Sequence, residues 1–114
     1  MGDCLFCSIA AGEMEAEIVH QDDRVVAFAD INPQAPVHFL IIPRKHLTGV
    51  NDIQPEDEEL VGHLYYIARK VAEEQGVAES GYRLVTNSGE DGGQEVDHLH
   101  LHLLGGRSLK WPPG

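Results

Sequence analysis

Three histidines alternate with leucines in the segment 98–104, whose sequence is His-Leu-His-Leu-His-Leu-Leu. Successive side chains of a β-strand point to opposite faces of the sheet, so we expect His98, His100 and His102 on one face and leucines on the other. The leucine face predicts contact with an apolar core. Because imidazole rings are costly to bury without polar partners, the histidine face predicts the border of a cleft.

Spacing alone leaves three interpretations of these histidines open. They could be unrelated side chains on a solvated strand face, although the strict alternation with leucine argues against this. They could bind a metal, because neutral imidazole is the commonest transition-metal ligand among side chains. They could also perform nucleophilic catalysis at phosphorus, with the central imidazole attacking while its neighbours orient it and stabilise charge.

A pair of cysteines, Cys4 and Cys7, has the C-x-x-C spacing. This spacing occurs in half of a zinc site, in redox pairs and by chance. In a reducing compartment two cysteines are not expected to form a structural disulfide. The residues alone do not choose among these alternatives.

The composition limits the classes of protein and partner. The chain of 114 residues has the length of one domain, which we place at residues 1–114. The formal net charge of −11 repels a phosphate backbone, so we expect no nucleic-acid partner. The sequence has neither the pattern of a signal peptide nor an apolar stretch long enough to cross a bilayer. We therefore expect a cytoplasmic protein with no membrane partner.

The elements that must position these residues follow from patterning and turn signals. A short helix is expected over 4–11, capped by Asp3 and stopped by Gly12. A long amphipathic helix is expected to begin at Pro55 and to end at Gly76. Strands are expected over 18–21, 25–29, 37–42, 82–86 and 98–104. Without an alternating βαβ pattern, this order predicts an α+β domain built on a five-stranded antiparallel sheet.

The chain resembles the histidine triad (HIT) family, and its tail and glycine-rich loop resemble the Hint branch. The segment 98–104 matches the triad signature of three histidines separated by apolar residues. Further matching motifs occur in order along nearly the whole chain, at 3–7, 28–31, 36–40, 43–46, Asn87, 92–94, 104–107 and 111–114.

The resemblance implies a homodimer whose two sheets join into one. It also implies hydrolysis of purine nucleoside phosphoramidates, such as adenylate joined to an amine, through a covalent nucleotidyl-histidine intermediate and with no cofactor required for catalysis. In this comparison His100 is the nucleophile, and His102 and His38 surround the phosphate. His98 supports the active arrangement of the strand.

The resemblance also implies contacts to each part of a purine nucleotide, an AMP or GMP conjugate. Asp30 would hold the ribose hydroxyls, and Trp111 would lie near the site of the partner subunit. The phosphate and leaving group would be contacted by Asn87 and by the loop residues Gly93, Gln94 and Glu95. The base pocket would be lined by Leu5, Phe6, Ile9, Phe28 and Ile31.

A structural zinc ion is a further implication of the resemblance. Some HIT proteins, largely bacterial, bind zinc through such a cysteine pair and two histidines, which correspond here to His46 and His98. Together with Cys4 and Cys7 they would make a tetrahedral Cys₂His₂ site, which braces the fold rather than catalysing.

Alternatives remain to the phosphoramidate activity. A dinucleoside polyphosphate hydrolase would use the same nucleophile and pocket, although the Hint-like tail disfavours it. A nucleotide-binding dimer with little turnover and a metal-dependent hydrolase at the triad are alternatives from other classes. Because every nucleotide reading requires a bound phosphate, we also expect the cleft to be locally positive inside the acidic surface.

Overall fold

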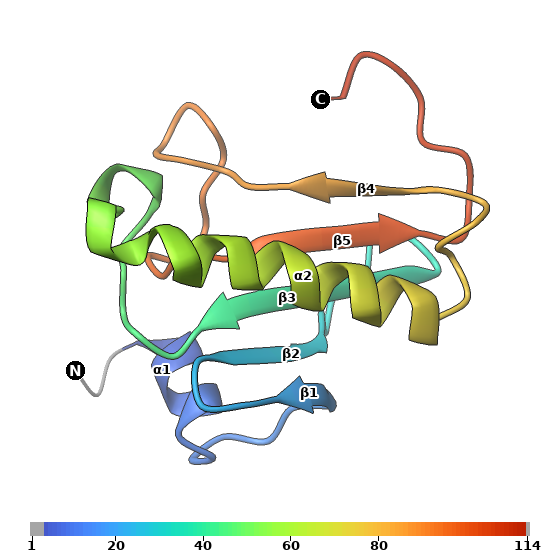
Figure 1. The fold of residues 1–114 in the computed structure, drawn as a ribbon. Coiled ribbons are helices and arrows are strands. Elements are labelled where there is room, and N and C mark those ends of the chain that lie inside the picture. Colours follow the sequence, from blue (N-terminus) through green and yellow to red (C-terminus); the bar gives the residue numbers. More distant parts are fainter. Residues whose placement is uncertain (1–3, 114) are drawn as a thin grey trace.

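Five strands form one antiparallel sheet in the computed structural model, which describes residues 4–113. The spatial order is β1-β2-β3-β5-β4 (Figure 1). The strands are β1 (Ile18–Gln21), β2 (Val25–Ala29), β3 (Val37–Pro43), β4 (Tyr82–Val85) and β5 (Leu101–Gly105). The predicted α+β class and the five antiparallel strands are confirmed.

Two α-helices accompany the sheet, α1 (Leu5–Ala10) and α2 (Glu58–Glu74), with short 3₁₀ turns at Val50–Asp52 and Pro55–Asp57. The predicted cap Asp3 lies outside the described residues. The N-cap position of α1 belongs to Cys4, whose Sγ accepts a hydrogen bond from the backbone N–H of Cys7 at 3.3 Å. Acidic residues occupy the first turn of α2, where the helix dipole favours negative charge.

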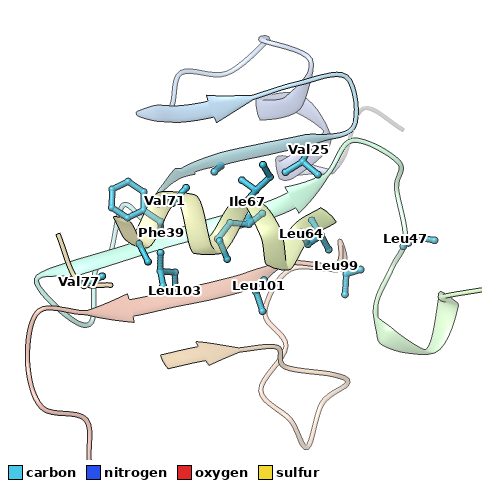
Figure 2. Close-up of a cluster of buried hydrophobic side chains, with 14 residues drawn as sticks. Val25, Phe39, Leu47, Leu64, Ile67, Val71, Val77, Leu99, Leu101 and Leu103 are labelled. Carbon is cyan, nitrogen blue, oxygen red and sulfur yellow. The ribbon is translucent and has the colours of Figure 1, made fainter. Parts of the chain in front are cut away.

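Alternation along the strands gives the sheet two different faces. One face packs against α2 and holds the larger core, in which Phe39, Leu101 and Leu103 meet Ile67 and Val71 (Figure 2). The opposite face carries α1 and a smaller apolar cluster, here called the α1 cluster, made of Phe6, Ile9, Val26, Phe28, Leu40 and Ile42. The catalytic candidates share this second face.

The strand predicted over 98–104 begins later than expected. Pairing between β3 and β5 ends at Leu101, and the backbone N–H of Leu99 donates instead to the carbonyl of Leu47, at 2.7 Å. The residues just before Leu101, including His98, therefore lie outside the hydrogen-bonded sheet. The alternation of side chains nevertheless extends beyond the strand, because Leu99, Leu101 and Leu103 all lie in the larger core.

Among residues 4–113, no helix is both long and apolar enough to cross a membrane.

Candidate active site

A cavity of about 560 Å³ opens on the face of the sheet that carries α1. Its size suits a small organic ligand. Most of the residues predicted to bind nucleotide line it together, namely Leu5, Phe6, Ile9, Phe28, Asp30, Ile31, His38, Asn87, Gly93, Glu95, His100 and His102. These residues come from α1, β2, β3 and β5, and from the loops between β2 and β3 and between β4 and β5.

Three of the predicted site residues do not line this cavity. The side chain of Gln94 bridges its own loop to the segment after β3, since its Nε2 donates to the carbonyl of Thr48 at 2.7 Å. Trp111 lies in the C-terminal tail with 82% of its surface exposed. His98 is fully buried, and its ring lies beside the cysteines.

The ring of His100 is oriented by the backbone two residues before it. Its Nδ1 lies 2.7 Å from the carbonyl oxygen of His98, and a carbonyl can only accept, so Nδ1 carries the proton. The neutral ring then has its lone pair on Nε2. The ring is 5% exposed, lines the cavity and meets the edge of Phe6 with ring centroids 5.1 Å apart. His100 is thus arranged as a nucleophile.

Asp30, His38 and His102, here called the Asp30 cluster, form a polar chain along the cavity. The backbone N–H of Gln34 donates to Nδ1 of His38 at 3.0 Å, so the proton of neutral His38 is on Nε2. This Nε2 lies 2.9 Å from Nδ1 of His102 and 3.3 Å from a carboxylate oxygen of Asp30. His102 accepts at Nδ1 and keeps its own proton on Nε2. Nε2–H of His102 is then available as a donor to a ligand.

Burial determines the charge of the Asp30 cluster. Burial, together with smaller effects of the nearby rings of His100 and His38, lowers the pKa of His102 to about 4, against an opposing effect of Asp30. Burial also lowers the pKa of His38, although Asp30 acts in the opposite direction. Both rings are therefore neutral near pH 7 in the free protein.

The expectation of a locally positive cleft is wrong. Among the described residues that line the cavity there are three carboxylates, Glu15, Asp30 and Glu95, and no lysine or arginine. The cavity lining is therefore acidic, like the chain as a whole. A phosphate in this site would be held by N–H dipoles of the backbone and of neutral histidines, which act without a fixed cation.

Cys4, Cys7, His46 and His98 come together next to the α1 cluster, with their ligand atoms all within 4.8 Å of one another. A tetrahedral zinc ion with ordinary bond lengths separates a sulfur and a nitrogen ligand by roughly 3.5 Å. The Sγ atoms of Cys4 and Cys7 lie 3.3 and 3.6 Å from Nδ1 of His98, and Cys7 Sγ lies 3.2 Å from Nδ1 of His46.

The orientation of His98 also suits a metal. Its Nε2 lies 2.8 Å from the carbonyl oxygen of Pro43, so Nε2 carries the proton and Nδ1 presents its lone pair to the thiols. A second hydrogen bond of this kind is the usual support of a metal-ligating histidine. The four residues fit a closed zinc site.

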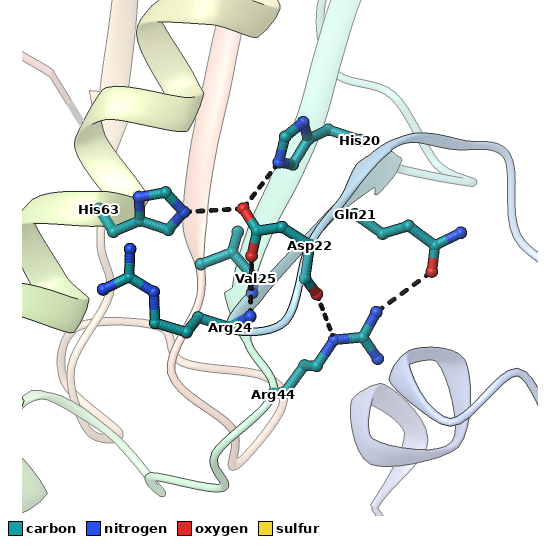
Figure 3. Close-up of polar contacts among 7 residues, drawn as sticks. All are labelled: His20, Gln21, Asp22, Arg24, Val25, Arg44 and His63. Carbon is teal, nitrogen blue, oxygen red and sulfur yellow. Dashed lines mark hydrogen bonds and ion pairs between the residues drawn. The ribbon is translucent and has the colours of Figure 1, made fainter.

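A second group, here called the Asp22 cluster, consists of Asp22, His20 and His63 and lies away from the cavity (Figure 3). One carboxylate oxygen of Asp22 accepts from Nε2 of His20 at 2.9 Å and from Nε2 of His63 at 2.7 Å. The other accepts from the backbone N–H groups of Arg24 and Val25, both at 2.8 Å. The sequence assigns no role to these two histidines, and here they join α2 to the β1–β2 hairpin.

Sequence reasoning also missed three polar residues of the cavity lining, Glu15, Asn32 and Gln34. Gln34 acts through its backbone N–H, which leaves no signature in a sequence. Glu15 lines the cavity beside Met14 and Ala16, in the segment between α1 and β1. The position of this segment after an amphipathic helix with a predicted binding role was the only available signal.

Comparison with known proteins agrees with this geometry. Residues 11–109 match the family described as HIT domain. The purine nucleoside phosphoramidase of Escherichia coli (strain K12) is 50% identical over 107 residues, which cover 94% of this chain and 90% of that protein. A HIT family hydrolase from Legionella pneumophila Philadelphia 1 is 54% identical, with a TM-score of 0.96 over 98% of this chain and 100% of the other. A histidine triad protein from Clostridium difficile is 45% identical, with a TM-score of 0.93 over 96% of each chain. The histidine motif, the fold and these similarities together show that the chain belongs to the HIT family.

Proposed function

We propose that this protein is an enzyme that hydrolyses purine nucleoside phosphoramidates, in which a nucleotide phosphate is joined to an amine through a P–N bond. The observation that carries the proposal is the hydrogen bond from Nδ1 of His100 to the carbonyl of His98, at 2.7 Å. It leaves the Nε2 lone pair of a cavity-lining imidazole free for attack. The similarity to a purine nucleoside phosphoramidase, 50% identical over 94% of this chain, supports the same substrate class.

The reaction proceeds in two displacements at phosphorus. In the first, Nε2 of His100 attacks the phosphorus and the P–N bond to the amine breaks. The bonding pair leaves with the amine nitrogen, which takes up a proton. In the second, water attacks the phosphorus and gives up a proton, the P–Nε2 bond breaks, and the imidazole recovers its lone pair. Covalent catalysis thus replaces one difficult step by two easier ones.

The Asp30 cluster supplies donors and the proton. Nε2–H of His102 is available to a phosphate oxygen or to the leaving nitrogen, and His38 fixes this tautomer through the contact at 2.9 Å. A bound phosphate places negative charge beside these rings, which raises their pKa from the low values of the free protein. His102 then acts as general acid once substrate is bound.

The cavity lining suggests how the base, ribose and phosphate of the substrate are arranged along it. The apolar side chains from α1 and β2 receive the base, Asp30 holds the ribose hydroxyls, and the histidines surround the phosphate. Gly93 and Asn87 contribute from the loop between β4 and β5. Gly93 has φ of 79°, a left-handed conformation that glycine adopts without strain.

We also propose that the Cys₂His₂ set binds a structural zinc ion. Four protein ligands leave no open position, so zinc supplies a brace and takes no part in the displacement. Bound at Nδ1 of His98, it would fix the residue whose carbonyl orients His100. Metal analysis of protein purified without chelator tests this. One equivalent of zinc in the wild type, lost in Cys4→Ser with Cys7→Ser, supports the site, and a metal-free wild type contradicts it.

We propose in addition that two chains form a homodimer through β4. This strand is at the edge of the sheet order and pairs within the described chain only with β5. An unpaired strand edge is a template for antiparallel pairing with a second copy. Light scattering after size exclusion tests the assembly: a mass of two chains supports it, and a mass of one chain at micromolar concentration contradicts it.

The experiment for the activity compares substrates and variants. Purified protein is assayed with an adenosine phosphoramidate and with a dinucleoside polyphosphate, each with and without EDTA. We expect faster hydrolysis of the phosphoramidate, no loss with EDTA over the assay, and a loss of at least about 10³-fold in His100→Ala. Retained AMP binding without turnover in the wild type would contradict the enzyme assignment. Full activity in His100→Ala would contradict the role of that residue.

A further inference from the structure

A glutamate, Glu15, lines the cavity from the segment between α1 and β1. Of the segment between α1 and β1, Met14, Glu15 and Ala16 line the cavity. Ala16 packs against the α1 cluster, which includes Phe6 and Phe28. Glu15 therefore borders the apolar part of the cavity, where the base is expected. Two nearby glutamates, Glu13 and Glu17, do not line the cavity.

The other polar side chains of the cavity belong to different segments. Asp30, Asn32 and Gln34 follow β2, and Asp30 lies 3.3 Å from His38, in the expected ribose and phosphate region. Asn87 and Glu95 come from the loop that leads to the histidines. Within residues 4–113, Glu15 is thus the cavity-lining polar side chain contributed by the α1 side.

The carboxylate of Glu15 is free to accept hydrogen bonds from a ligand. The side chain is exposed, and no hydrogen bond or ion pair joins it to another group within the described part of the chain. An ionised carboxylate only accepts, and its two oxygens can receive two parallel N–H bonds. The matching ligand is one that presents two adjacent N–H donors at the outer edge of a purine.

Guanine presents such an edge and adenine does not. Guanine carries N1–H beside its 2-amino group, and both can donate to one carboxylate. Adenine carries its 6-amino group beside N1, whose lone pair would face the second carboxylate oxygen and repel it. With the ribose at Asp30, the outer edge of the base points away from the histidines. We propose that Glu15 makes this cavity prefer guanine nucleotides over adenine nucleotides, an inference that rests on the proposed nucleotide-hydrolase function.

The charge of Glu15 has two separable effects. It repels the phosphate of every nucleotide by a similar amount, and this effect cancels when two bases with the same leaving group are compared. The paired hydrogen bonds act on guanine alone. Because the carboxylate is solvated, we expect less than the usual strength of hydrogen bonds to charged groups, and a preference of about 3- to 10-fold in kcat/KM.

The test uses guanosine, inosine and adenosine phosphoramidates with one common amine. Inosine has N1–H and lacks the 2-amino group, so the wild type is expected to rank guanosine above inosine and inosine above adenosine. In Glu15→Ala the ratio of guanosine to adenosine should approach one. The control variants Glu13→Ala and Glu17→Ala remove the same charge from positions outside the cavity and should keep the wild-type ratio.

Two results would overturn the inference. One is a wild-type ratio of one or less, and the other is a ratio that Glu15→Ala leaves unchanged. Calorimetric binding of GMP and AMP to the same four proteins gives a readout that needs no turnover. If the wild type hydrolyses none of the three substrates, the proposed hydrolase function fails. A preference for GMP that disappears in Glu15→Ala would then still support the role of Glu15, and equal binding would contradict it.

Discussion

The Asp22 cluster and the Asp30 cluster contain the same residue types, one aspartate and two histidines, and they serve different purposes. In the Asp22 cluster one carboxylate receives all four donors, two from imidazoles and two from the backbone (Figure 3). In the Asp30 cluster a chain of hydrogen bonds runs along a cavity and ends at a histidine with a donor to spare. A closed set of partners braces a fold, and an open one can bind and react with a ligand.

The two clusters also differ in what they join. His63 belongs to α2 and His20 to β1, so the Asp22 cluster ties the helix to the edge of the sheet. His38 and His102 lie on adjacent strands, where Leu40 pairs with His102 and His38 pairs with Leu104. This register makes the two rings diagonal neighbours on one face. The pairing of β3 with β5 therefore positions these two candidate catalytic residues.

The largest difference should appear when one histidine is removed from each cluster. His102→Ala is expected to lower kcat for an adenosine phosphoramidate by about 10²- to 10³-fold, because the general acid and a phosphate donor are both lost. His20→Ala should leave kcat within about twofold. Steady-state kinetics of the two purified variants measures this. Equal losses in both would show that the comparison is mistaken.

When the aspartates are replaced and stability is measured, the larger effect should come from the Asp22 cluster. Asp22→Ala leaves two backbone N–H groups and two imidazoles without their acceptor, and we expect unfolding to become easier by about 2 kcal/mol. Asp30→Asn keeps the size and the acceptor of the side chain, and should change stability by less than about 1 kcal/mol. Urea unfolding at pH 7 provides both values. A larger loss in Asp30→Asn would contradict the distinction between brace and site.

The smallest expected effect concerns pH. His102 has a pKa of about 4 in the folded protein, because it is buried, against about 6.5 when unfolded. Between these values the unfolded chain binds a proton that the folded chain does not, so stability falls as the pH falls from about 6.5 to 4. His102→Gln cannot titrate, and its stability should decline less over this interval, by about 1–2 kcal/mol.

The carboxylate of Asp22 acts in a lower range. Burial alone would raise its pKa, but hydrogen bonds from His20 and His63 and from two backbone amides lower it well below the usual value. A depressed carboxylate pKa contributes stability that is complete above about pH 4 and is lost as the pH falls further. Urea unfolding of the wild type, His102→Gln and Asp22→Ala across pH 3 to 7 separates the two ranges. Identical profiles for all three would contradict both assignments.

Much of the fold follows from local patterns. The hairpin of β1 and β2 has the bounds that its alternation and its Asp22-Asp23 turn predict. The start of β5 could not be predicted, because it depends on a bond between Leu99 and Leu47, which are distant in sequence. The Asp22 cluster could not be predicted for the same reason, since His63 contacts Asp22 only when α2 packs on the sheet.

The site was predictable where a motif carried it. The triad signature pointed to His100 and His102, which line the cavity, and the Cys-x-x-Cys pair pointed to the Cys₂His₂ cluster that fits a zinc ion. The charge of the cavity was not predictable, because a requirement for phosphate binding suggested a cation and the protein supplies neutral donors. The tautomers of His100 and His38 could not be predicted either, because they depend on backbone hydrogen bonds to the carbonyl of His98 and from the N–H of Gln34.

The central claim is that His100 forms a bond to phosphorus. Its most direct test is rapid quenching of the wild type during turnover of an adenosine phosphoramidate, followed by peptide mass spectrometry under neutral conditions. We predict one adenylyl group on the peptide that contains His100, absent from His100→Ala and present in His20→Ala. Turnover without any adduct on that peptide, or an adduct that persists in His100→Ala, would contradict the account.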